Sequence, residues 1–395
     1  MKQLLILAAL AVASASSAEP VNKFQLRNDD GNAEVSAGEL QPGEKSLAPG
    51  KTLSADGKTV WWDGSLVPME GKGFKDTKRF YDRMPARLEQ DKSVRRGVWS
   101  QCYHSSGECF RFRLKGASVF KVRWSLVHSS LAMGHMPATG VSGLDLYLRD
   151  KQTGEWKFFQ NARPSKQNGN EATFHTYGSD AMVYLPLYNG PSKVEFGVPE
   201  GASFEPLPAR ENGVVKPVVF YGTSITHGGC CSRPGLAFPA IVCRRLNAPL
   251  VNLGFSGNGR MELSMADYVG EVDASCYVLD CLWNMGGTRW VKEKHRERYE
   301  PFIRNLRAKR PGVPIVMAEH CDVYCKGPDE RDRFIKGLYD KLIAEGWTNL
   351  VYLPNAGMYP DDLEGTVDGA HASDYGMLSL AKAFGDAVRK ALKGR

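Results

Sequence analysis

The sequence predicts an all-β domain of jelly-roll-like sandwich type, followed by an α/β domain whose parallel sheet has about five strands. One observation is a series of short aromatic and β-branched segments between residues 97 and 204, several with the two-residue period of half-buried strands. The second is an alternation of apolar runs with segments of helical spacing after residue 216. With 395 residues, of which 42% are hydrophobic, the chain can form two cores.

In the first domain, turn residues separate the predicted strands, as expected for a sandwich. These strands cover residues 110–114, 119–124, 144–148, 156–159, 173–177, 182–187 and 194–198. Four tryptophans could stack on sugars, although a place in the core is the simpler interpretation for each: Trp61, Trp62, Trp124 and Trp156. Four histidines are interpreted as structural or surface groups: His104, His128, His135 and His175.

In the second domain, strands and helices alternate with short connections, which favours a parallel sheet covered on both faces. The strands are expected near residues 218–221, 250–253, 274–279, 313–318 and 349–353. The helices are expected at about residues 235–246, 261–269, 290–309, 329–345 and 374–392. Prolines and a glycine in residues 206–216 indicate a linker, which places the β domain at 19–205 and the α/β domain at 217–395.

Residues 1–18 are typical of a secretory signal peptide, because Lys2 precedes an apolar core and a run of small residues that ends at Ala18, the expected cleavage point. The mature protein is therefore expected to be soluble and secreted or periplasmic. No later stretch predicts a membrane span. The net charge of +7 is spread along the chain, so no nucleic-acid partner is expected.

The nine cysteines are moderate in number for an exported chain of this length. Two pairs are close enough in sequence to be disulfide candidates: Cys102 with Cys109, and Cys321 with Cys325. Zinc is the alternative for four cysteines that follow predicted strand ends: Cys230, Cys231, Cys321 and Cys325. Adjacent cysteines are not a usual ligand spacing, so neither a metal nor a cofactor is expected.

A serine lies at the first strand end of the α/β domain. The apolar run 218–221 breaks at Gly222 into Thr223 and Ser224, and helical spacing follows. Open α/β sheets bind ligands at the carboxyl ends of their strands. In this position Ser224 can present its hydroxyl to a cleft and its N–H to an oxyanion.

Other polar groups lie at loop and strand ends that can meet Ser224. Asp368 and His371 are three residues apart at a loop-to-helix junction and can supply a carboxylate and an imidazole. The glycine-rich loop 254–259 follows a strand and can direct N–H groups at an anion. Asn284 follows another strand and offers an amide donor.

These blocks, in this order, resemble the SGNH hydrolases, also called the GDSL esterase superfamily. The matching segments are GTSITHG, NLGFSGNG, DCLWN and DGAH, within residues 215–392. The resemblance implies a flavodoxin-like strand order, Ser224 as nucleophile, His371 as general base and Asp368 as the carboxylate that orients it. It also implies an oxyanion hole made of the N–H groups of Ser224 and Gly257 and the Asn284 side chain. Thr223 replaces the Asp of the G-D-S form, which is not the triad carboxylate.

The segment 143–147 also resembles the G-x-D-L-Y signature of an amino-terminal domain that precedes some bacterial SGNH hydrolases.

The resemblance to the SGNH hydrolases implies ester hydrolysis through an acyl-enzyme. Export and an aromatic β domain favour an acetylated polysaccharide or oligosaccharide as substrate. Two alternatives stay open, an esterase or lipase acting on lipids or small acyl esters, and an inactive carbohydrate-binding protein. Four residues could line the pocket. His227, Arg260 and Glu262 are interpreted instead as solvated loop or helix-start residues, and Trp283 as a core residue.

Overall fold

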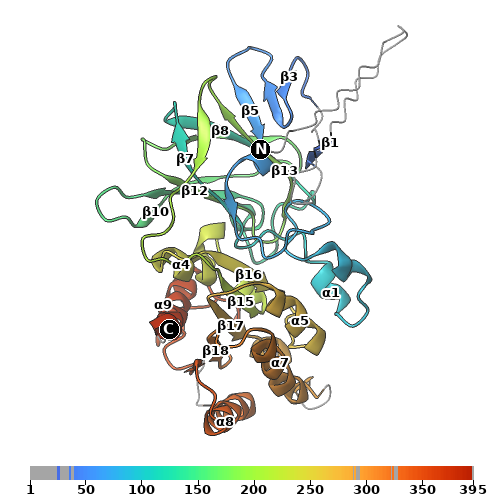
Figure 1. Cartoon of the computed structure of the whole chain (residues 1–395), viewed down its shortest axis with the longest axis vertical. Helices are drawn as coiled ribbons and strands as arrows, with labels where there is room; N and C mark the ends of the chain where they lie inside the picture. Colours follow the sequence, from blue (N-terminus) through green and yellow to red (C-terminus); the bar gives the residue numbers. More distant parts are fainter. Residues whose placement is uncertain are drawn as a thin grey trace, which may run out of the picture.

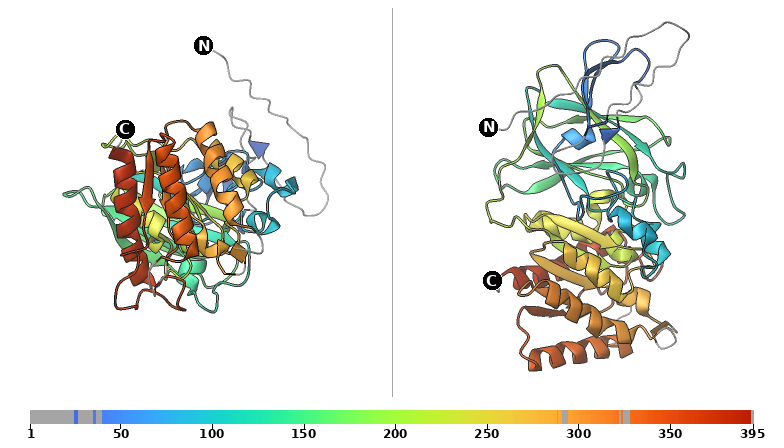
Figure 2. Two further views of the ribbon diagram at one scale, coloured as in Figure 1. Left: turned by 90° about the horizontal axis from the view of Figure 1, so that it is seen from below. Right: turned by 45° about the vertical axis from the view of Figure 1, so that its right-hand side comes forward.

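The computed structural model describes residues 40–287, 289–290, 294–321, 323 and 328–393, together with the two short strands β1 (Gln25–Leu26) and β2 (Val35–Ser36). The predicted signal peptide, residues 1–18, lies outside these residues. A β domain and an α/β domain are stacked along the long axis of the molecule (Figures 1 and 2).

Within the described residues, the β domain consists of two six-stranded sheets whose paired strands are antiparallel. The first sheet contains β10 (Trp156–Ala162), β9 (Leu144–Arg149), β12 (Ala181–Tyr184), β7 (Cys109–Lys115) and β14 (Ser203–Pro206), with β6 (Met69–Glu70) on β7. The second contains β11 (Asn170–His175), β8 (Val119–Leu126), β13 (Pro191–Val198), β5 (Val60–Asp63), β4 (Lys51–Leu53) and β3 (Lys45–Ala48). Aromatic side chains from both sheets fill the space between them, which confirms the predicted sandwich.

The tryptophans of this domain are mostly core residues. Trp61, Trp124 and Trp156 are buried. Trp62 is half-buried and packs edge-on against Phe204. The simpler interpretation is therefore confirmed, and the buried three offer no stacking surface.

The α/β domain contains, in the described residues, a five-stranded parallel sheet of order β16-β15-β17-β18-β19. Its strands are β15 (Val218–Gly222), β16 (Leu250–Gly254), β17 (Cys276–Asp280), β18 (Ile315–Ala318) and β19 (Leu350–Leu353). Numbered by position in the chain, this order is the flavodoxin-like arrangement that the resemblance implied.

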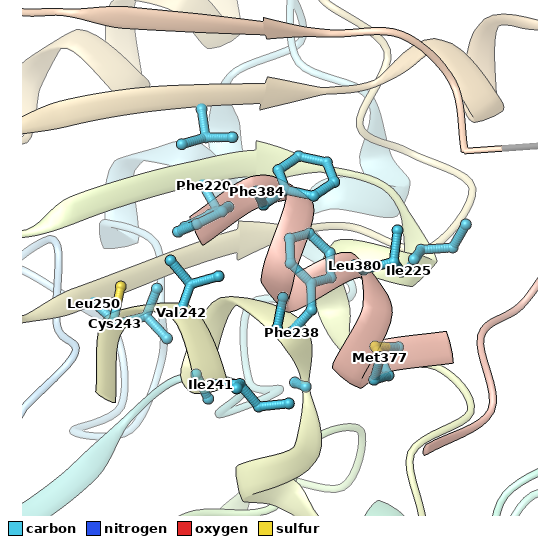
Figure 3. Packing of buried hydrophobic residues seen from close by; sticks show 14 of the residues in the cluster. Phe220, Ile225, Phe238, Ile241, Val242, Cys243, Leu250, Met377, Leu380 and Phe384 are labelled. Atoms are coloured by element: carbon cyan, nitrogen blue, oxygen red, sulfur yellow. The ribbon is translucent and has the colours of Figure 1, made fainter. Parts of the chain in front are cut away.

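Successive residues of β15 serve opposite faces of the sheet. Val218 and Phe220 belong to the buried cluster of α4 (Phe238–Arg245) and α9 (Asp374–Lys393), where Phe220, Phe238 and Phe384 pack together (Figure 3). Val219 and Tyr221 belong to the cluster of the other face. The helices of that face are α5 (Leu263–Glu271), α7 (Arg296–Lys309) and α8 (Glu330–Ala344).

One segment of the first domain packs on the second. It carries the 3₁₀ helix η2 (Ala86–Gln90) and α1 (Arg96–Trp99), which lies beside α5 (Figures 1 and 2). Met84, Leu88 and Val98 are buried in the same cluster as the strands of the α/β sheet. This contact was not predicted, because the segment has no sustained periodicity that would reveal a buried face.

The eight cysteines among the described residues are buried and form no disulfide. The predicted pair of Cys102 and Cys109 is therefore wrong. The Cys102 thiol contacts the carbonyl of Val98 in the segment on the α/β domain, whereas Cys109 begins β7 of the sandwich. Cys325, the predicted partner of Cys321, lies outside the described residues.

Candidate active site

Ser224 begins the short helix α3 (Ser224–His227), immediately after β15. Thr223 is the N-cap, and its hydroxyl accepts a hydrogen bond from the N–H of Ile225 at 3.2 Å. Gly222 ends the strand where any Cβ would overlap the hydroxyl of Thr226. The turn therefore needs a glycine before it and a short hydroxyl side chain as its cap, and Thr223 supplies that cap without an aspartate.

The structure brings Ser224, His371 and Asp368 into one hydrogen-bonded chain. Ser224 Oγ lies 2.8 Å from His371 Nε2, and His371 Nδ1 lies 2.8 Å from Asp368 Oδ2. The other carboxylate oxygen of Asp368 accepts the backbone N–H groups of Ala370 and His371 at 3.0 and 2.7 Å. The short spacing of Asp368 and His371 therefore closes a local turn that holds the imidazole toward the serine.

Opposing effects act on the pKa of Asp368. Partial burial raises it, but hydrogen bonds from the backbone and ring of His371 and from the Ala370 N–H outweigh burial and hold the pKa below its ordinary value. The carboxylate is thus ionised at neutral pH and can stabilise a positive charge on His371.

Two backbone N–H groups are available beside the serine. Ser224 is the first residue of α3, so its N–H has no acceptor in the preceding turn of helix. Gly257 has φ of +68°, a conformation that favours glycine, and lies in the loop after β16. Neither N–H donates to another group within the described part of the chain. Both are candidates to bind an oxyanion.

Asn284 lies on the 3₁₀ helix η4 (Leu282–Met285) after β17, and its side chain is buried. The side-chain amide nitrogen donates to the carbonyls of Phe255 and Gly259 at 3.3 and 3.2 Å. Asn284 therefore contacts the glycine loop, as expected for an oxyanion-hole residue, but its two N–H bonds are directed at the loop itself.

The glycine loop is braced from the β-domain side by residues that sequence reasoning missed. The buried guanidinium of Arg83 donates to the carbonyls of Asn252 and Gly254 at 2.8 and 3.0 Å. The Gln101 amide donates to the carbonyl of Ser256 at 2.8 Å. Arg83 and Gln101 come from the segment around η2 and α1, so this part of the first domain helps to position Gly257.

Beneath α3, the two domains meet through aromatic rings. His227 is buried and stacks on Tyr188, with ring centroids 4.0 Å apart. Its Nε2 lies 3.2 Å from Nδ1 of His104. The hydroxyl of Tyr188 donates to the carbonyl of Ser224 at 3.3 Å. Burial, with a contribution from the Arg83 charge, lowers the pKa of both histidines well below the ordinary value. His227 is therefore a structural residue beneath the nucleophile, and its interpretation as a solvated residue is wrong because the β domain covers it.

The G-x-D-L-Y signature also lies at the domain interface. Asp145, fully buried on β9, accepts hydrogen bonds from the guanidinium of Arg233 at 3.1 Å and from the N–H of Gly235 at 2.8 Å. The hydroxyl of Tyr147 is 2.6 Å from the same guanidinium. Because Arg233 and Gly235 follow α3 along the chain, the signature holds the β domain against the segment that follows the nucleophile.

The remaining candidates have structural contacts. Arg260 donates to the carbonyl of Gly257 at 2.8 Å, and Glu262 pairs with Arg95 at 3.1 Å. Trp283 is half-buried, with its ring centroid 5.6 Å from that of His320. Arg260 thus adds a further hydrogen bond that holds the glycine loop, as its position just after the loop could have suggested.

Within the described residues, one group has a spacing suited to a metal ion: His320, Asp329 and Asp332. Asp329 and Asp332 form the capping box of α8, and Asp332 accepts from the ring and backbone of His320 at 2.9 and 3.3 Å. These bonds account for the cluster without an ion. It contains none of the cysteines considered as zinc ligands. None of the described helices combines the length and the apolar character of a membrane span.

Comparisons with known proteins agree with this geometry. Residues 215–389 match the GDSL-like Lipase/Acylhydrolase family, and residues 59–204 match a family described as the N-terminus of Esterase_SGNH_hydro-type. A structure described as a GDSL-like lipase from Bacteroides ovatus is 26% identical, with a TM-score of 0.72 over 85% of this chain and 98% of that chain. No curated protein sequence matches the chain.

More distant structures share the two-domain fold. A salicylyl-acyltransferase from a tetracycline biosynthetic pathway is 16% identical, with a TM-score of 0.64 over 89% of this chain and 98% of that chain. A family two carbohydrate esterase from Clostridium thermocellum is 14% identical, with a TM-score of 0.53 over 73% of this chain and 93% of that chain. With family matches over both domains, the chain belongs to the SGNH/GDSL hydrolases that carry an amino-terminal GxDLY domain.

Proposed function

We propose that this SGNH acylhydrolase is an exported esterase that removes acetyl groups from a polysaccharide or oligosaccharide, with Ser224 as nucleophile. The observation that carries the esterase mechanism is the chain of two 2.8 Å hydrogen bonds from Ser224 through His371 to Asp368. The predicted signal peptide and the carbohydrate-esterase relatives that share the two-domain fold support the choice of substrate.

In the first half of the reaction, Ser224 Oγ attacks the ester carbonyl while His371 Nε2 accepts the hydroxyl proton. The carbonyl oxygen becomes an oxyanion, which the N–H groups of Ser224 and Gly257 bind, together with the amide of Asn284. His371 then gives its proton to the alkoxy oxygen as the C–O bond breaks. The alcohol leaves, and the acetyl group stays on Ser224.

In the second half, His371 takes a proton from water as the water oxygen attacks the acyl carbon. The same donors bind the second oxyanion. His371 returns that proton to Ser224 Oγ as the bond between Oγ and the acyl carbon breaks, and acetic acid leaves and ionises to acetate in solution. Asp368 stabilises the positive imidazole in both halves and does not itself change its protonation state.

A second candidate is an esterase or lipase acting on longer acyl chains, which the similarity to a GDSL-like lipase favours. The two candidates differ in the acyl pocket. An acetylesterase accommodates one methyl group beyond the carbonyl, whereas a lipase needs an apolar surface for a chain.

The test is hydrolysis of p-nitrophenyl acetate, butyrate and octanoate by the mature chain, beside Ser224→Ala and the control Ser46→Ala, which changes an exposed serine of β3. We expect the acetate to be the best ester and Ser224→Ala to lower turnover by about 10⁴-fold or more. Ser46→Ala should retain turnover. Release of acetate from acetylated polysaccharides then identifies the glycan.

A preference for octanoate would support the lipase candidate instead. Equal turnover of Ser224→Ala and the unchanged chain would remove Ser224 from the mechanism. Binding of glycans without turnover of any ester would support the inactive carbohydrate-binding alternative.

A further inference from the structure

A loop of the β domain reaches the catalytic histidine. It connects β8 to α2 (Ala138–Val141), and His135 lies at its exposed tip. The ring centroid of His135 is 6.0 Å from that of His371, with 41° between the ring planes. The sequence had placed His135 among structural or surface histidines, so its position beside the active site is new information from the fold.

The tip is anchored in the molecule. Met133 and Met136 exchange two backbone hydrogen bonds of 3.0 Å, which close a tight turn around His135. Met136 is buried and belongs to the same cluster as Cys230 and Ala372 of the α/β domain. That cluster contains residues of both domains, and the ring contact of His135 with His371 places the turn beside the α/β domain.

Two buried polar side chains hold the rest of the loop. The amide of Asn189 donates to the carbonyls of His128 and Ser130 at 2.9 and 3.3 Å and accepts the N–H of His128 at 2.9 Å. The hydroxyl of Ser142, also buried, donates to the carbonyl of Leu131 at 2.8 Å. A loop fixed along its backbone in this way can hold a side chain at a set place in a binding site.

The chemistry of the neighbouring histidine indicates which part of a substrate His135 meets. His371 gives its proton to the alkoxy oxygen, so the alcohol part of the ester departs from beside the His371 ring. A side chain next to that ring therefore lies near the departing alcohol. The ring nitrogens of exposed His135 form no hydrogen bond with any other described residue, so both are available to a ligand. Imidazole offers one donor and one acceptor, which suits a hydroxyl group.

We propose that His135 is a specificity-determining residue that hydrogen-bonds a hydroxyl of the alcohol part of the substrate. The enzyme then prefers esters of polyols and sugars to esters of simple alkyl alcohols, and the β domain supplies part of that preference. The inference rests on the proposed function for its choice of acetyl esters.

The experiment compares three acetates that differ in the alcohol: ethyl acetate, glycerol monoacetate and a monoacetylated methyl xyloside. The variants are His135→Ala, His135→Gln, which keeps a hydrogen-bonding side chain, and the control His175→Ala, an exposed histidine of β11 that stacks on Tyr177. Loss of one hydrogen bond to a neutral hydroxyl should lower kcat/KM of His135→Ala by about 3- to 10-fold on the two hydroxyl-bearing esters.

Ethyl acetate should be cleaved by His135→Ala at the unchanged rate, because that alcohol has no second hydroxyl. His135→Gln should retain part of the preference, and His175→Ala all of it. An equal loss of kcat/KM on all three acetates in His135→Ala, or no loss on any of them, would overturn the role of His135. The same conclusion would follow if the unchanged protein cleaved all three acetates equally well.

The same data separate the two proposals. If the acetylated xyloside is not cleaved but a preference for glycerol monoacetate over ethyl acetate is lost in His135→Ala, the glycan substrate is wrong and the role of His135 holds. If the xyloside is cleaved equally well by His135→Ala, the role of His135 is wrong and the glycan substrate holds. Failure to cleave any acetate overturns both.

Discussion

At the scale of single residues, Asn284 supports the glycine loop and is proposed to bind the oxyanion as well. Its amide holds the glycine loop through bonds of 3.2 and 3.3 Å, at and just beyond the upper end of the usual range for N–H donors. Because these bonds are weak, one N–H of the Asn284 amide can donate instead to an oxyanion, which is a stronger acceptor than a backbone carbonyl. The same side chain can therefore shape the loop in the resting enzyme and stabilise charge during the reaction.

We predict that Asn284→Ala lowers kcat by about 10²–10³, with a smaller change in KM, because the lost donor acts on the transition state more than on the ground state. Steady-state kinetics with p-nitrophenyl acetate measures this effect, and thermal unfolding of the same variant measures the supporting role. Near-normal turnover would exclude Asn284 from the oxyanion hole.

At the scale of elements, the G-x-D-L-Y signature connects β9 to the segment after α3 through the hydrogen bonds of Asp145 and Tyr147. Burial raises the pKa of Asp145, while the charge of Arg233 and hydrogen bonds from Asn161 and the Gly235 N–H lower it and offset part of the effect. A buried carboxylate is tolerated here because a cation and several donors surround it.

Asp145→Ala leaves the half-buried Arg233 without its carboxylate, so we expect the free energy of unfolding to fall by about 3–5 kcal/mol. Tyr147→Phe removes only one hydroxyl from the same guanidinium and should cost about 1 kcal/mol. Urea unfolding of both variants checks the order. Equal stability of Asp145→Ala and the unchanged chain would show that the contacts of Asp145 contribute nothing to the free energy of unfolding.

At the scale of the whole molecule, burial of ionisable groups near the domain interface makes stability depend on pH. Glu108 is fully buried just before β7, and its carboxylate oxygens have no hydrogen-bond partner among the described residues. Burial raises its pKa to about 8, although Lys72 and Arg83 act in the opposite direction. His104 and His227, at the domain interface, act in the opposite sense. Their pKa values are lowered, so the folded protein favours their neutral form and loses stability as the pH falls.

The sign of the Glu108 effect follows from its raised pKa. The stability tied to this group is fully present below the ordinary value near 4.5 and is lost as the pH rises toward about 8. Glu108→Gln keeps the side chain neutral, so its stability relative to the unchanged chain should rise between pH 5 and pH 8, by at most about 1.4 kcal/mol per pH unit. Urea unfolding at both pH values measures the difference. A constant difference would show that Glu108 does not titrate in this window.

The sequence by itself determined the two domains, the strand ends and the residues that meet at them. Ser224, Gly257 and Asn284 each follow an apolar strand, and the carboxyl ends of parallel strands share one edge of the sheet. Asp368 and His371 could be paired because their contact is local in sequence. Periodicity and short spacing are properties of neighbouring residues, so a sequence displays them directly.

The tertiary structure alone decided how the β domain takes part. The contacts of Arg83 with the glycine loop, of Asp145 with Arg233 and of His135 with His371 join residues far apart in the chain. They depend on how two domains dock, and no local pattern encodes that. The cysteines and tryptophans show the same limit, since whether a side chain pairs, stacks on a ligand or fills a core depends on what the fold places against it.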